Sequence, residues 1–513
     1  MTAVDKVLVI CGHPRTDSFC HALADAYEAG ARAGGAEVRR LDVARLDFDV
    51  HVRYPSPNQQ ICEPDVARAR ELIAWAGHVV FVYPTWWGTM PALLKGFLDR
   101  VLVPGFAFEE TEDPAVWKRL LEGRSAELVV TMDTPPWVYR LVYKQPGHNA
   151  MRRATLGFCG IEPTLVQTIG PVKPADEQQR AAWLTQVREA GERLSRRLAR
   201  ARRRRHAASW VKALRLQFYP MTWIAYTIGA LAAVQGGGAF SGARYWLGYA
   251  ALFLVEAMTV FINEYVDYDS DRRNDNAGPF NGGSRVLVTG ELKRGHLPWA
   301  VGLLALPLAG VVWWLFAPPS PLDGTDFALL ALAGLLAVGY TLPPLKLSYR
   351  GLGELDVALT HSVVVILAGY VVQTGHWGDP FPWLVGVPLF FATLPSIILS
   401  GIPDHDADRA VGKRTLAVIA GPARAAQWAL VSALAAVILG WVWYGGGMFQ
   451  GGLWFVALAL ATLHALWLVY ALAGYLRRGG PVERINGLMV LSLTFVLWFG
   501  VVPLLDLWWR LPG

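Results

Sequence analysis

Short and long apolar segments alternate over the first 200 residues of this chain, and the spacing changes abruptly after them. Short runs rich in β-branched residues occur at 7–10, 78–83, 127–132 and 164–169. Longer segments with helical periodicity separate them, such as 20–33, 65–76 and 91–101. This alternation predicts a parallel sheet covered by helices on both faces. We therefore expect an α/β doubly wound domain whose ligand site lies beyond the carboxyl ends of the strands.

From about Tyr219 onward the apolar segments lengthen to about 20 residues, which is the length that crosses a bilayer. Nine such segments follow one another, at 219–236, 244–264, 297–317, 326–343, 355–373, 381–400, 425–444, 453–475 and 485–508. The pattern predicts an all-α polytopic membrane domain of about nine helices over 217–513. A soluble domain over 1–200 would precede it, joined through a basic juxtamembrane linker over 201–216.

Charged residues assign a side of the membrane to these segments. Lysine and arginine gather in the loops after even-numbered spans, for example at Arg272, Lys293 and Lys346, whereas loops after odd-numbered spans carry mainly acids. Basic loops stay in the cytoplasm. We therefore expect a multi-pass protein of the inner (cytoplasmic) membrane, with its N-terminal domain cytosolic and its C-terminus outside. An arginine run at 193–205 precedes the first span, so the net charge of +6 points to anionic lipid and not to nucleic acid.

The first predicted strand ends in the segment CGHPRTDSF, residues 11–19, directly before a predicted helix. A loop of small and hydroxyl residues at a helix N-terminus offers backbone N–H groups and a positive dipole end to a phosphate. The residues expected around such a phosphate are His13, Thr16, Ser18 and Phe19. A simple capped turn, with Asp17 or Ser18 as the N-cap, remains the alternative.

The third strand leads into YPTWWGTMPALLKGFLDRVLVPGFAF, residues 83–108. An aromatic, glycine-containing turn can press backbone amides and a Trp face against a planar ring system. This segment resembles the NAD(P)H:quinone oxidoreductase family, in which P-x-x-W-x-x-x-P-A-x-x-K-G-x-x-D-R-V follows the same strand. The resemblance implies a flavodoxin-like fold, FAD or FMN as cofactor, NAD(P)H as reductant and a possible homodimer. It places around the flavin ring Pro84, Thr85, Trp86, Trp87 and Gly88, with Phe106 closing the pocket. Packing of Trp86 and Trp87 in the core is the alternative.

The chain departs from this family after the fourth strand. Residues 132–137 read MDTPPW where the family often carries a glycine-rich turn, and this puts the shape of the nicotinamide and quinone pocket in question. The family's catalytic Tyr–His pair is loosely matched by Tyr143 and His148, which would assist hydride transfer. The flavin supplies the hydride chemistry while the protein orients the rings.

Two groups of carboxylates stand at the ends of the second and sixth apolar spans. In the first, Asn263, Asp267 and Asp271 are spaced by four residues, so on a continuing helix they share one face. In the second, Asp404 and Asp408 have the same spacing. Acids at membrane-embedded helix ends are costly unless paired or hydrated, and two such faces make an oxygen-rich site for Mg²⁺. Solvated helix ends are the alternative for either group alone.

These groups resemble the UbiA superfamily, which pairs N-x-x-x-D-x-x-x-D with D-x-x-x-D, and the resemblance covers 210–510. Segments 281–292, 340–354 and 406–418 look like the branch that prenylates 1,4-dihydroxy-2-naphthoate or naphthoquinols. By resemblance, Asp267, Asp271, Asp404 and Asp408 hold Mg²⁺ on a polyprenyl diphosphate, assisted by Asn263 and Asp406. The cations expected to neutralise the leaving diphosphate are Arg285, Lys346, Arg350, Lys413 and Arg414. His361 is a candidate proton acceptor or acceptor-binding group.

The two halves suggest one reaction sequence, because a hydroquinone is a better carbon nucleophile than a quinone. The hypothesis is a bifunctional enzyme that reduces a quinone with NAD(P)H and prenylates the hydroquinone, in menaquinone-type lipid-quinone biosynthesis. Fusion would raise the effective concentration of the intermediate. Two alternatives stay open: a membrane transporter with a regulatory flavin oxidoreductase domain, and a prenyltransferase with a non-catalytic soluble domain.

Overall fold

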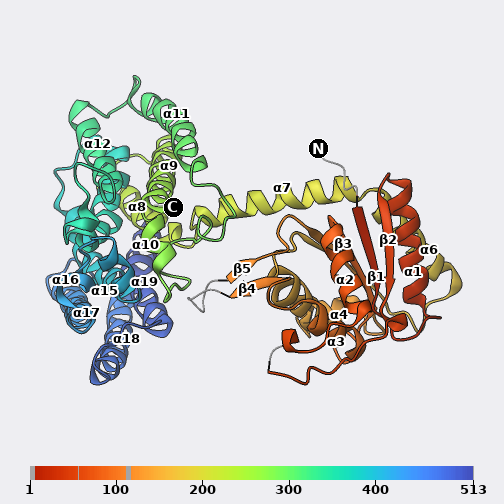
Figure 1. The fold of residues 1–513 in the computed structure, drawn as a ribbon. Helices are drawn as coiled ribbons and strands as arrows, with labels where there is room; N and C mark the ends of the chain where they lie inside the picture. Colours follow the sequence, from red (N-terminus) through yellow and green to blue (C-terminus); the bar gives the residue numbers. More distant parts are fainter. Residues whose placement is uncertain (1–5, 56, 111–116, 512–513) are drawn as a thin grey trace. The chain divides into compact units, whose positions relative to one another are not determined.

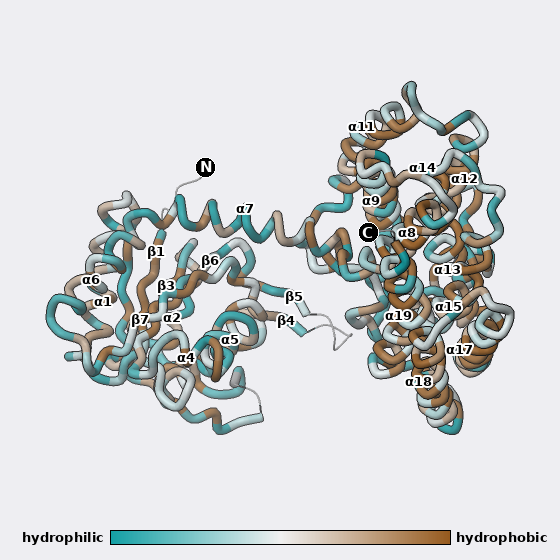
Figure 2. The backbone as a smooth tube through the Cα atoms, turned by 180° about the vertical axis from the view of Figure 1, so that it is seen from behind, coloured by the Kyte–Doolittle hydropathy of each residue, from teal (hydrophilic) through white to brown (hydrophobic). Residues whose placement is uncertain are grey.

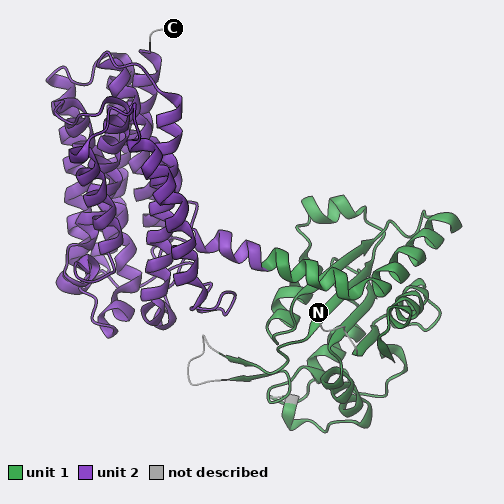
Figure 3. Cartoon of the chain, turned by 90° about the horizontal axis from the view of Figure 1, so that it is seen from above, with its two compact units in different colours: residues 1–205 green, residues 206–513 purple. Residues whose placement is uncertain are grey.

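The computed structural model describes residues 6–55, 57–110 and 117–511. It divides into two compact units, residues 1–205 and 206–513 (Figure 3). Each unit is described separately below.

Unit 1 is built on a five-stranded parallel sheet in the order β2-β1-β3-β6-β7 (Figure 1). The strands are β1 (Lys6–Cys11), β2 (Glu37–Asp42), β3 (His78–Pro84), β6 (Ser125–Thr131) and β7 (Thr164–Ile169). All residues of β3 and β6 are buried, as expected for central strands with both faces covered. The predicted doubly wound α/β fold is confirmed.

Alternate residues of β1 serve the two faces of this sheet. Val7 and Val9 belong to a core cluster with α1 (Phe19–Ala33) and α6 (Glu177–Glu192). Leu8 and Ile10 belong to a second cluster with α2 (Pro64–Trp75) and α3 (Ala92–Val101). This is the period-two alternation of a strand between two helical layers. Unit 1 also contains the antiparallel pair β4 (Phe108–Glu110) and β5 (Trp117–Arg119), the short helices α4 (Pro136–Leu141) and α5 (Pro146–Asn149), 3₁₀ turns over Val43–Arg45 and Pro57–Gln59, and a π-helix over Ala150–Gly157.

The segment predicted as a basic linker lies mostly in a helix, α7 (Leu194–Ala213). Its first turn is fixed to unit 1, because the Arg197 guanidinium pairs with Glu127 of β6, whose side chain is fully buried. The two nitrogens of Arg197 lie 2.5 and 2.8 Å from the two carboxylate oxygens. Tyr27 and Gln167 also donate to this carboxylate, at 2.9 and 2.6 Å.

The regular elements described in unit 2 are helices, and each segment predicted to span the membrane is helical over most of its length. The long elements are α8 (Tyr219–Gln235), α9 (Gly242–Val266), α11 (His296–Phe316), α12 (Gly324–Gly339), the continuous run Gly353–Thr374 that contains α13 (Gly353–Leu359) and α14 (Val365–Thr374), α15 (Pro380–Ala410), α17 (Pro422–Gly445), α18 (Gly452–Arg477) and α19 (Asn486–Trp509). The short helices α10 (Tyr268–Arg273) and α16 (Leu416–Ala420) follow α9 and α15. Hydrophobic residues line most of their length (Figure 2).

Seven of the described helices are long and apolar enough to cross a membrane, fewer than the nine predicted. The difference lies in α8 and α12, which have 17 and 16 residues. At 1.5 Å per residue, helices of this length reach about 25 Å, short of the roughly 30 Å hydrocarbon core. The predicted span 326–343 was too long because its last apolar residues, 340–343, form a turn after α12.

Glycine allows α8 and α14 (Val365–Thr374) to pack closely. A Cβ on Gly229 would collide with the carbonyl oxygen of Ile366, and one on Gly369 with that of Tyr226. Small residues at helix interfaces permit such backbone approach where no hydrophobic effect drives helices together. Alanines play the same part between α17 and α18, where Ala429, Ala433 and Ala461 are fully buried.

Candidate functional sites

The loops after β1 and β3 meet at the carboxyl edge of the sheet in unit 1. Because these strands pair in parallel, Gly12 N–H reaches Val82 O at 2.8 Å, and the two loops leave side by side. The His13 and Trp86 rings then meet edge to face, with centroids 5.6 Å apart. The predicted phosphate loop and the predicted ring-binding loop are therefore one constellation.

The loop after β3 is a tight turn that turns its aromatic side chains outward. Backbone bonds close it in both directions between Trp86 and Thr89, at 2.8 and 3.0 Å. Trp87 and Gly88 have φ values of +51° and +77°, in the left-handed region that favours glycine. Trp86 is 46% exposed and Trp87 is fully exposed, so the core-packing alternative is wrong for both. An exposed indole beside a strained turn is suited to cover a planar ligand.

The loop after β1 has the character of an open helix end. Ser18 precedes α1 as its N-cap residue but makes no side-chain cap bond, and its Oγ lies 2.9 Å from His21 Nδ1. Asp17 pairs with Arg15 at 3.0 Å. The capped-turn alternative is therefore not what forms. The His21 N–H donates to Ser18 O at 2.9 Å, so an anion at this helix end would meet the N–H groups of Phe19 and Cys20. Thr16 is exposed here, and Phe19 is half-buried with its ring 6.2 Å from that of Trp183.

The structure places Tyr139, and not Tyr143, against His148. The Tyr139 and His148 rings lie 5.0 Å apart at 72°, while Tyr143 is 60% exposed. Tyr139 OH donates to Gly88 O at 2.8 Å and accepts from Gly147 N at 2.9 Å, which ties the pair to the turn after β3. The sequence offers two tyrosines in one short stretch, and only the direction of α4 decides between them. Pairing Tyr143 with His148 was therefore wrong.

His148 is held as a neutral imidazole. It is 3% exposed, and burial lowers its pKa to about 4, with a smaller contribution from Arg152. Its Nε2 is buried and makes no hydrogen bond within the described residues. Such an unsatisfied polar atom beside an exposed aromatic turn is suited to a ligand oxygen or nitrogen. Phe106 is elsewhere: its half-buried ring packs on the core, with the Arg70 guanidinium carbon 6.0 Å away.

The two predicted carboxylate groups of unit 2 meet in one buried cluster, which we call the aspartate cluster: Asp267, Asp271, Asp404 and Asp408. Lys413 joins the two groups, because its Nζ lies 2.7 Å from Asp267 Oδ2 and 3.4 Å from Asp408 Oδ1. The side chains of Asp267, Asp408 and Lys413 are at most 9% exposed. Acids far apart in the sequence, at the end of α9 and within α15, therefore share one counter-ion.

The i to i+4 hydrogen bonds continue past the end of α9, as the spacing of the first motif predicts. Asp267 N donates to Asn263 O and Asp271 N to Asp267 O, both at 2.8 Å. Asp271 is buried against Gly283, whose φ is +67°; a Cβ there would collide with the Asp271 carboxylate. The glycine is thus required for the loop 274–295 to close over the cluster.

That loop supplies polar partners that motif spacing did not reveal. Asn274 and Asn281 donate to Asp404 Oδ1 at 2.5 and 2.7 Å, and Gly282 N donates to Asp404 Oδ2 at 3.3 Å. Ser270 Oγ donates to Asp408 Oδ1 at 2.7 Å. Asn274, Asn281 and Gly282 lie between the two motifs and outside any regular spacing, so the only signal for them in the sequence is the polar, glycine-rich composition of 274–284. Ser270 lies within the first motif, in α10.

The predicted diphosphate-binding cations divide into two groups. Lys346 and Lys413 both approach the Tyr349 ring, with Nζ 4.6 and 6.0 Å from its centroid. Arg285, at φ +61°, donates to the carbonyls of Asp271 and Asn274, both at 3.1 Å. Arg350 and Arg414 are exposed, and Arg350 donates to Pro344 O at 2.8 Å. The structure therefore brings Lys413, Lys346 and Arg285 to the cluster or its neighbouring side chains.

Two predicted assisting residues lie outside the cluster. The Asp406 side chain faces the opposite side of α15 from Asp404 and Asp408, and it is therefore 78% exposed. Its carboxylate lies next to the His405 ring. His361 lies within 3.0 Å of Val357 O of its own helical run, so its Nδ1 is occupied there. Assistance from Asp406 and acceptor binding by His361 are not supported by these positions.

The donor set suits a magnesium–diphosphate complex. Mg²⁺ prefers carboxylate and phosphate oxygens, and the cluster offers four carboxylates. Asp267 Oδ1 is buried without a hydrogen-bond partner among the described residues, which leaves a ligand position open beside Lys413. Burying an unpaired carboxylate oxygen is unfavourable, and a bound cation would remove that cost.

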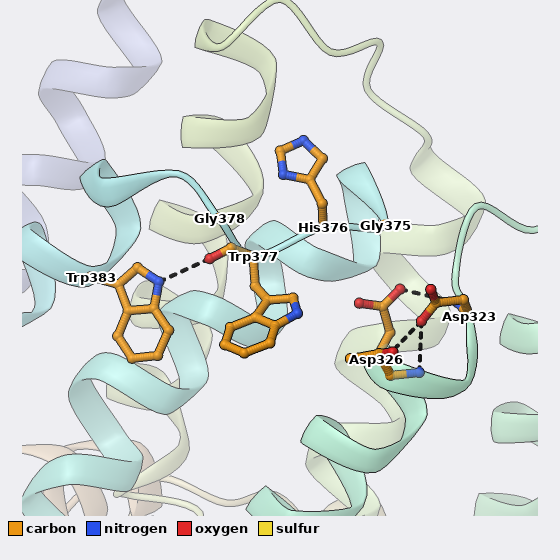
Figure 4. Close-up of a pocket in the computed structure, with 8 residues that line it drawn as sticks. Asp323, Asp326, Gly375, His376, Trp377, Gly378 and Trp383 are labelled. Carbon is orange, nitrogen blue, oxygen red and sulfur yellow. Dashed lines mark hydrogen bonds between the residues drawn. The ribbon is translucent and has the colours of Figure 1, made fainter.

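A cavity of about 620 Å³ lies apart from the cluster, between the loops that precede α12 and α15 (Figure 4). Its acids already have a structural role, because Asp323 accepts from Thr325 N and Asp326 N, and Asp326 accepts from Asp323 N. These bonds are a capping box that starts α12. Trp377 and Trp383 line the same cavity, and the indole N–H of Trp383 donates to Trp377 O. Cavity size alone does not identify the reactive site here.

Fold and site together define an α/β unit with an exposed aromatic turn at the carboxyl edge of its sheet, followed by a helical unit with a buried aspartate cluster. The sequence profile of a flavodoxin-like fold family matches residues 5–190. The profile of the UbiA prenyltransferase family matches residues 222–484, and the chain belongs to that family. Both parts belong to enzyme families, and a prenyltransferase assignment replaces the transporter alternative.

Known proteins resemble each part separately. An uncharacterized NAD(P)H oxidoreductase of Haemophilus influenzae is 29% identical over 183 residues, 34% of this chain and 89% of the relative. NAD(P)H dehydrogenase [quinone] 1 of Rattus norvegicus is 26% identical over 199 residues, 34% and 72% of the two chains. Lycopene elongase/hydratase of Corynebacterium glutamicum is 26% identical over 232 residues, 45% and 76%. A UbiA homolog from Archaeoglobus fulgidus, solved with DMAPP and Mg²⁺, is 20% identical, with a TM-score of 0.38 over 57% of this chain and 99% of that one.

Proposed function

We propose that this protein reduces a quinone with NAD(P)H and then transfers a polyprenyl group from its diphosphate to the hydroquinone. The observation that carries the membrane half is the Lys413 bridge between Asp267 and Asp408. The observation that carries the soluble half is the meeting of the His13 loop, the Trp86–Trp87 turn and the Tyr139–His148 pair. The domains would be a reductase over 1–200, a linker over 201–216 and a prenyltransferase over 217–513.

In the reductase, a bound FAD or FMN would take a hydride from NAD(P)H and pass two electrons to the quinone. The first turn of α1, with His13, Thr16 and Ser18, would bind the flavin phosphate. The exposed Trp86 and Trp87 would cover the ring, and the backbone of the turn would face its polar edge. His148, neutral at pH 7, would hold a quinone oxygen through Nε2, positioned by Tyr139.

In the prenyltransferase, Asp267, Asp271, Asp404 and Asp408 would hold Mg²⁺, which neutralises the donor diphosphate. Lys413 and Lys346 would contact the diphosphate as point charges, and Arg285 would fix the loop. The C1–O bond of the donor breaks, and diphosphate leaves with the electron pair. A ring carbon of the hydroquinone forms the new C–C bond and loses its proton. The buried site keeps water away from the allylic cation.

The naphthoquinone acceptor, the menaquinone-type product and the cytosolic position of unit 1 are parts of the same proposal. Basic loops after even-numbered spans support the orientation, since the aspartate cluster would then open on the side where NAD(P)H is present. Lipid is the expected surrounding of unit 2, and a homodimer through unit 1 is possible by family resemblance.

The test is product analysis by mass spectrometry with the purified full-length protein. Menadione, a polyprenyl diphosphate, Mg²⁺ and NADPH should together give prenylated hydroquinone and diphosphate. Omitting NADPH should stop the product, and supplying the chemically reduced hydroquinone should restore it. Asp267→Asn should abolish transfer, while Glu483→Gln, at an ion pair with Arg478 outside the cluster, should not. Equal prenylation of the oxidised quinone without NADPH contradicts the coupling.

A further inference from the structure

Glu256 is an acid within a membrane-spanning helix, and the chemistry proposed above does not use it. It lies ten residues before α9 ends at Val266, and its side chain is half-buried. Ten residues correspond to about 15 Å along a helix axis, which is well inside an apolar span. An acid at this depth is costly unless it meets polar groups, and it therefore indicates a functional site.

Helix geometry places Glu256 on the same face of α9 as the aspartate cluster. Eleven residues separate it from Asp267, which is about three full turns, and the helical hydrogen bonding continues through Asn263 to Asp267. Tyr245 lies eleven residues earlier, again on this face, and is 6% exposed. The face therefore turns into unit 2 and not towards lipid. Glu256 is placed beneath the cluster, about 16 Å deeper along the axis.

Two hydroxyl-bearing residues of α8 pack against this part of α9. Thr222 Oγ1 donates to Glu256 Oε1 at 3.3 Å. The ring of Tyr219 packs on Phe253, one turn of α9 away, with centroids 5.0 Å apart. The Tyr219 hydroxyl is buried and has no hydrogen-bond partner within the described part of the chain. A buried hydroxyl without a partner is unfavourable, and a ligand with a matching polar group would remove that cost.

We infer that Glu256, Thr222 and Tyr219 form the subsite for a hydroxyl of the aromatic acceptor, and that Glu256 selects an uncharged hydroquinone over an aromatic carboxylate. This inference rests on the proposed prenyl transfer. The hydroquinone O–H donates to Glu256, and its oxygen accepts from Tyr219. A carboxylate on the ring would bring a negative charge next to another acid in a largely buried site, where few solvent molecules would compensate it. The aromatic ring of the acceptor thus lies deeper in the membrane than the diphosphate, with an uncharged hydroxyl directed towards Glu256.

The experiment measures kcat/KM for prenyl transfer with two pre-reduced acceptors, menadiol and 1,4-dihydroxy-2-naphthoate, in the full-length protein. Wild type should prefer menadiol. Glu256→Gln, which keeps size and shape, should lower kcat/KM for menadiol about 10-fold to 100-fold, the usual range for a hydrogen bond to a charged group. The same variant should raise relative use of the naphthoate, and Glu256→Arg should favour it. Thr222→Val should weaken menadiol binding, seen in KM. Glu483→Gln is the matched acid-to-amide control.

The outcomes separate this inference from the proposed function. Transfer by wild type with a preference for the naphthoate, or an acceptor ratio unchanged in both Glu256→Gln and Thr222→Val, overturns the subsite and leaves prenyl transfer standing. No diphosphate release by wild type with any acceptor overturns prenyl transfer itself. A ratio that shifts towards the naphthoate in Glu256→Gln, with the control unchanged, supports the subsite.

Discussion

Replacing Arg197 with methionine should destabilise unit 1 by about 3 kcal/mol. Glu127 has no solvent exposure, and Arg197 is its bidentate cationic partner. Removing one partner of a buried ion pair typically costs about 3–5 kcal/mol. The lower end applies because Tyr27 and Gln167 still donate to the carboxylate and the Arg197 side chain is 29% exposed. Methionine preserves most of the aliphatic stem, so the change reports mainly on charge.

Pulse proteolysis in urea on the full-length protein measures this loss, because the surviving fragment of unit 1 can be followed separately. Arg193→Met is the matched control: its pair with Glu189 is exposed at both side chains and should contribute less than about 0.5 kcal/mol. The double variant Arg197→Met with Glu127→Gln should recover much of the loss, since no buried charge remains unpaired. A loss below about 1 kcal/mol for Arg197→Met, or no recovery in the double variant, refutes the assignment.

Three further changes test other parts of the structure. Lys413→Met should lower kcat for prenyl transfer at least 100-fold with Mg²⁺ saturating, because the cluster loses its shared cation. Diphosphate release measured over a Mg²⁺ titration checks this prediction, and a normal kcat contradicts it. Gly229→Val should lower the thermal midpoint of unit 2 in detergent, since its side chain meets Ile366 O, whereas Gly302→Val, which has open space, should not. Acidification should destabilise unit 1. Burial lowers the pKa of His78 from 6.5 to about 3 and that of His148 to about 4. Below pH 6.5 the unfolded chain therefore binds more protons than the folded one, and stability falls with pH. Each histidine then removes about 2 kcal/mol by pH 5, measured as urea midpoints from pH 7.5 to 5, and His78→Gln should flatten the profile.

The order of strands and helices in unit 1 was predictable because short β-branched runs and helical periodicity are local properties. The apolar runs at 7–10 and 78–83 predicted β1 and β3, and their alternation with helical segments predicted a parallel sheet. Tyr139 was not predictable, because its contact with His148 depends on the direction of a six-residue helix. The same local argument failed for α12, whose apolar run continues past Gly339 into a turn.

The aspartates were found because metal–diphosphate chemistry needs carboxylates on one helix face, and that requirement appears as a spacing of four. Lys413 was predicted as a contact to diphosphate, but its position between Asp267 and Asp408 is a tertiary property. Asn274 and Asn281 could not be found by spacing, because an irregular loop carries them to Asp404. Glu256 lies in an apolar segment whose high mean hydropathy masks a single acidic residue. Its proposed role in acceptor binding is indicated only by its neighbours on α8.

A built-in ammonium group would allow the proposed prenyl-transfer centre to form without its proposed metal. Lys413 offsets part of the negative charge that would otherwise drive α9 and α15 apart, so folding need not wait for ion binding. Chelation should accordingly switch the enzyme off while leaving its melting behaviour almost unchanged, unlike small zinc domains that unravel when stripped. In the resting protein, the Lys413 ammonium would occupy the position between the aspartates that a divalent ion takes when the donor binds. During turnover, the same ammonium would lie next to the phosphates and contact the leaving diphosphate.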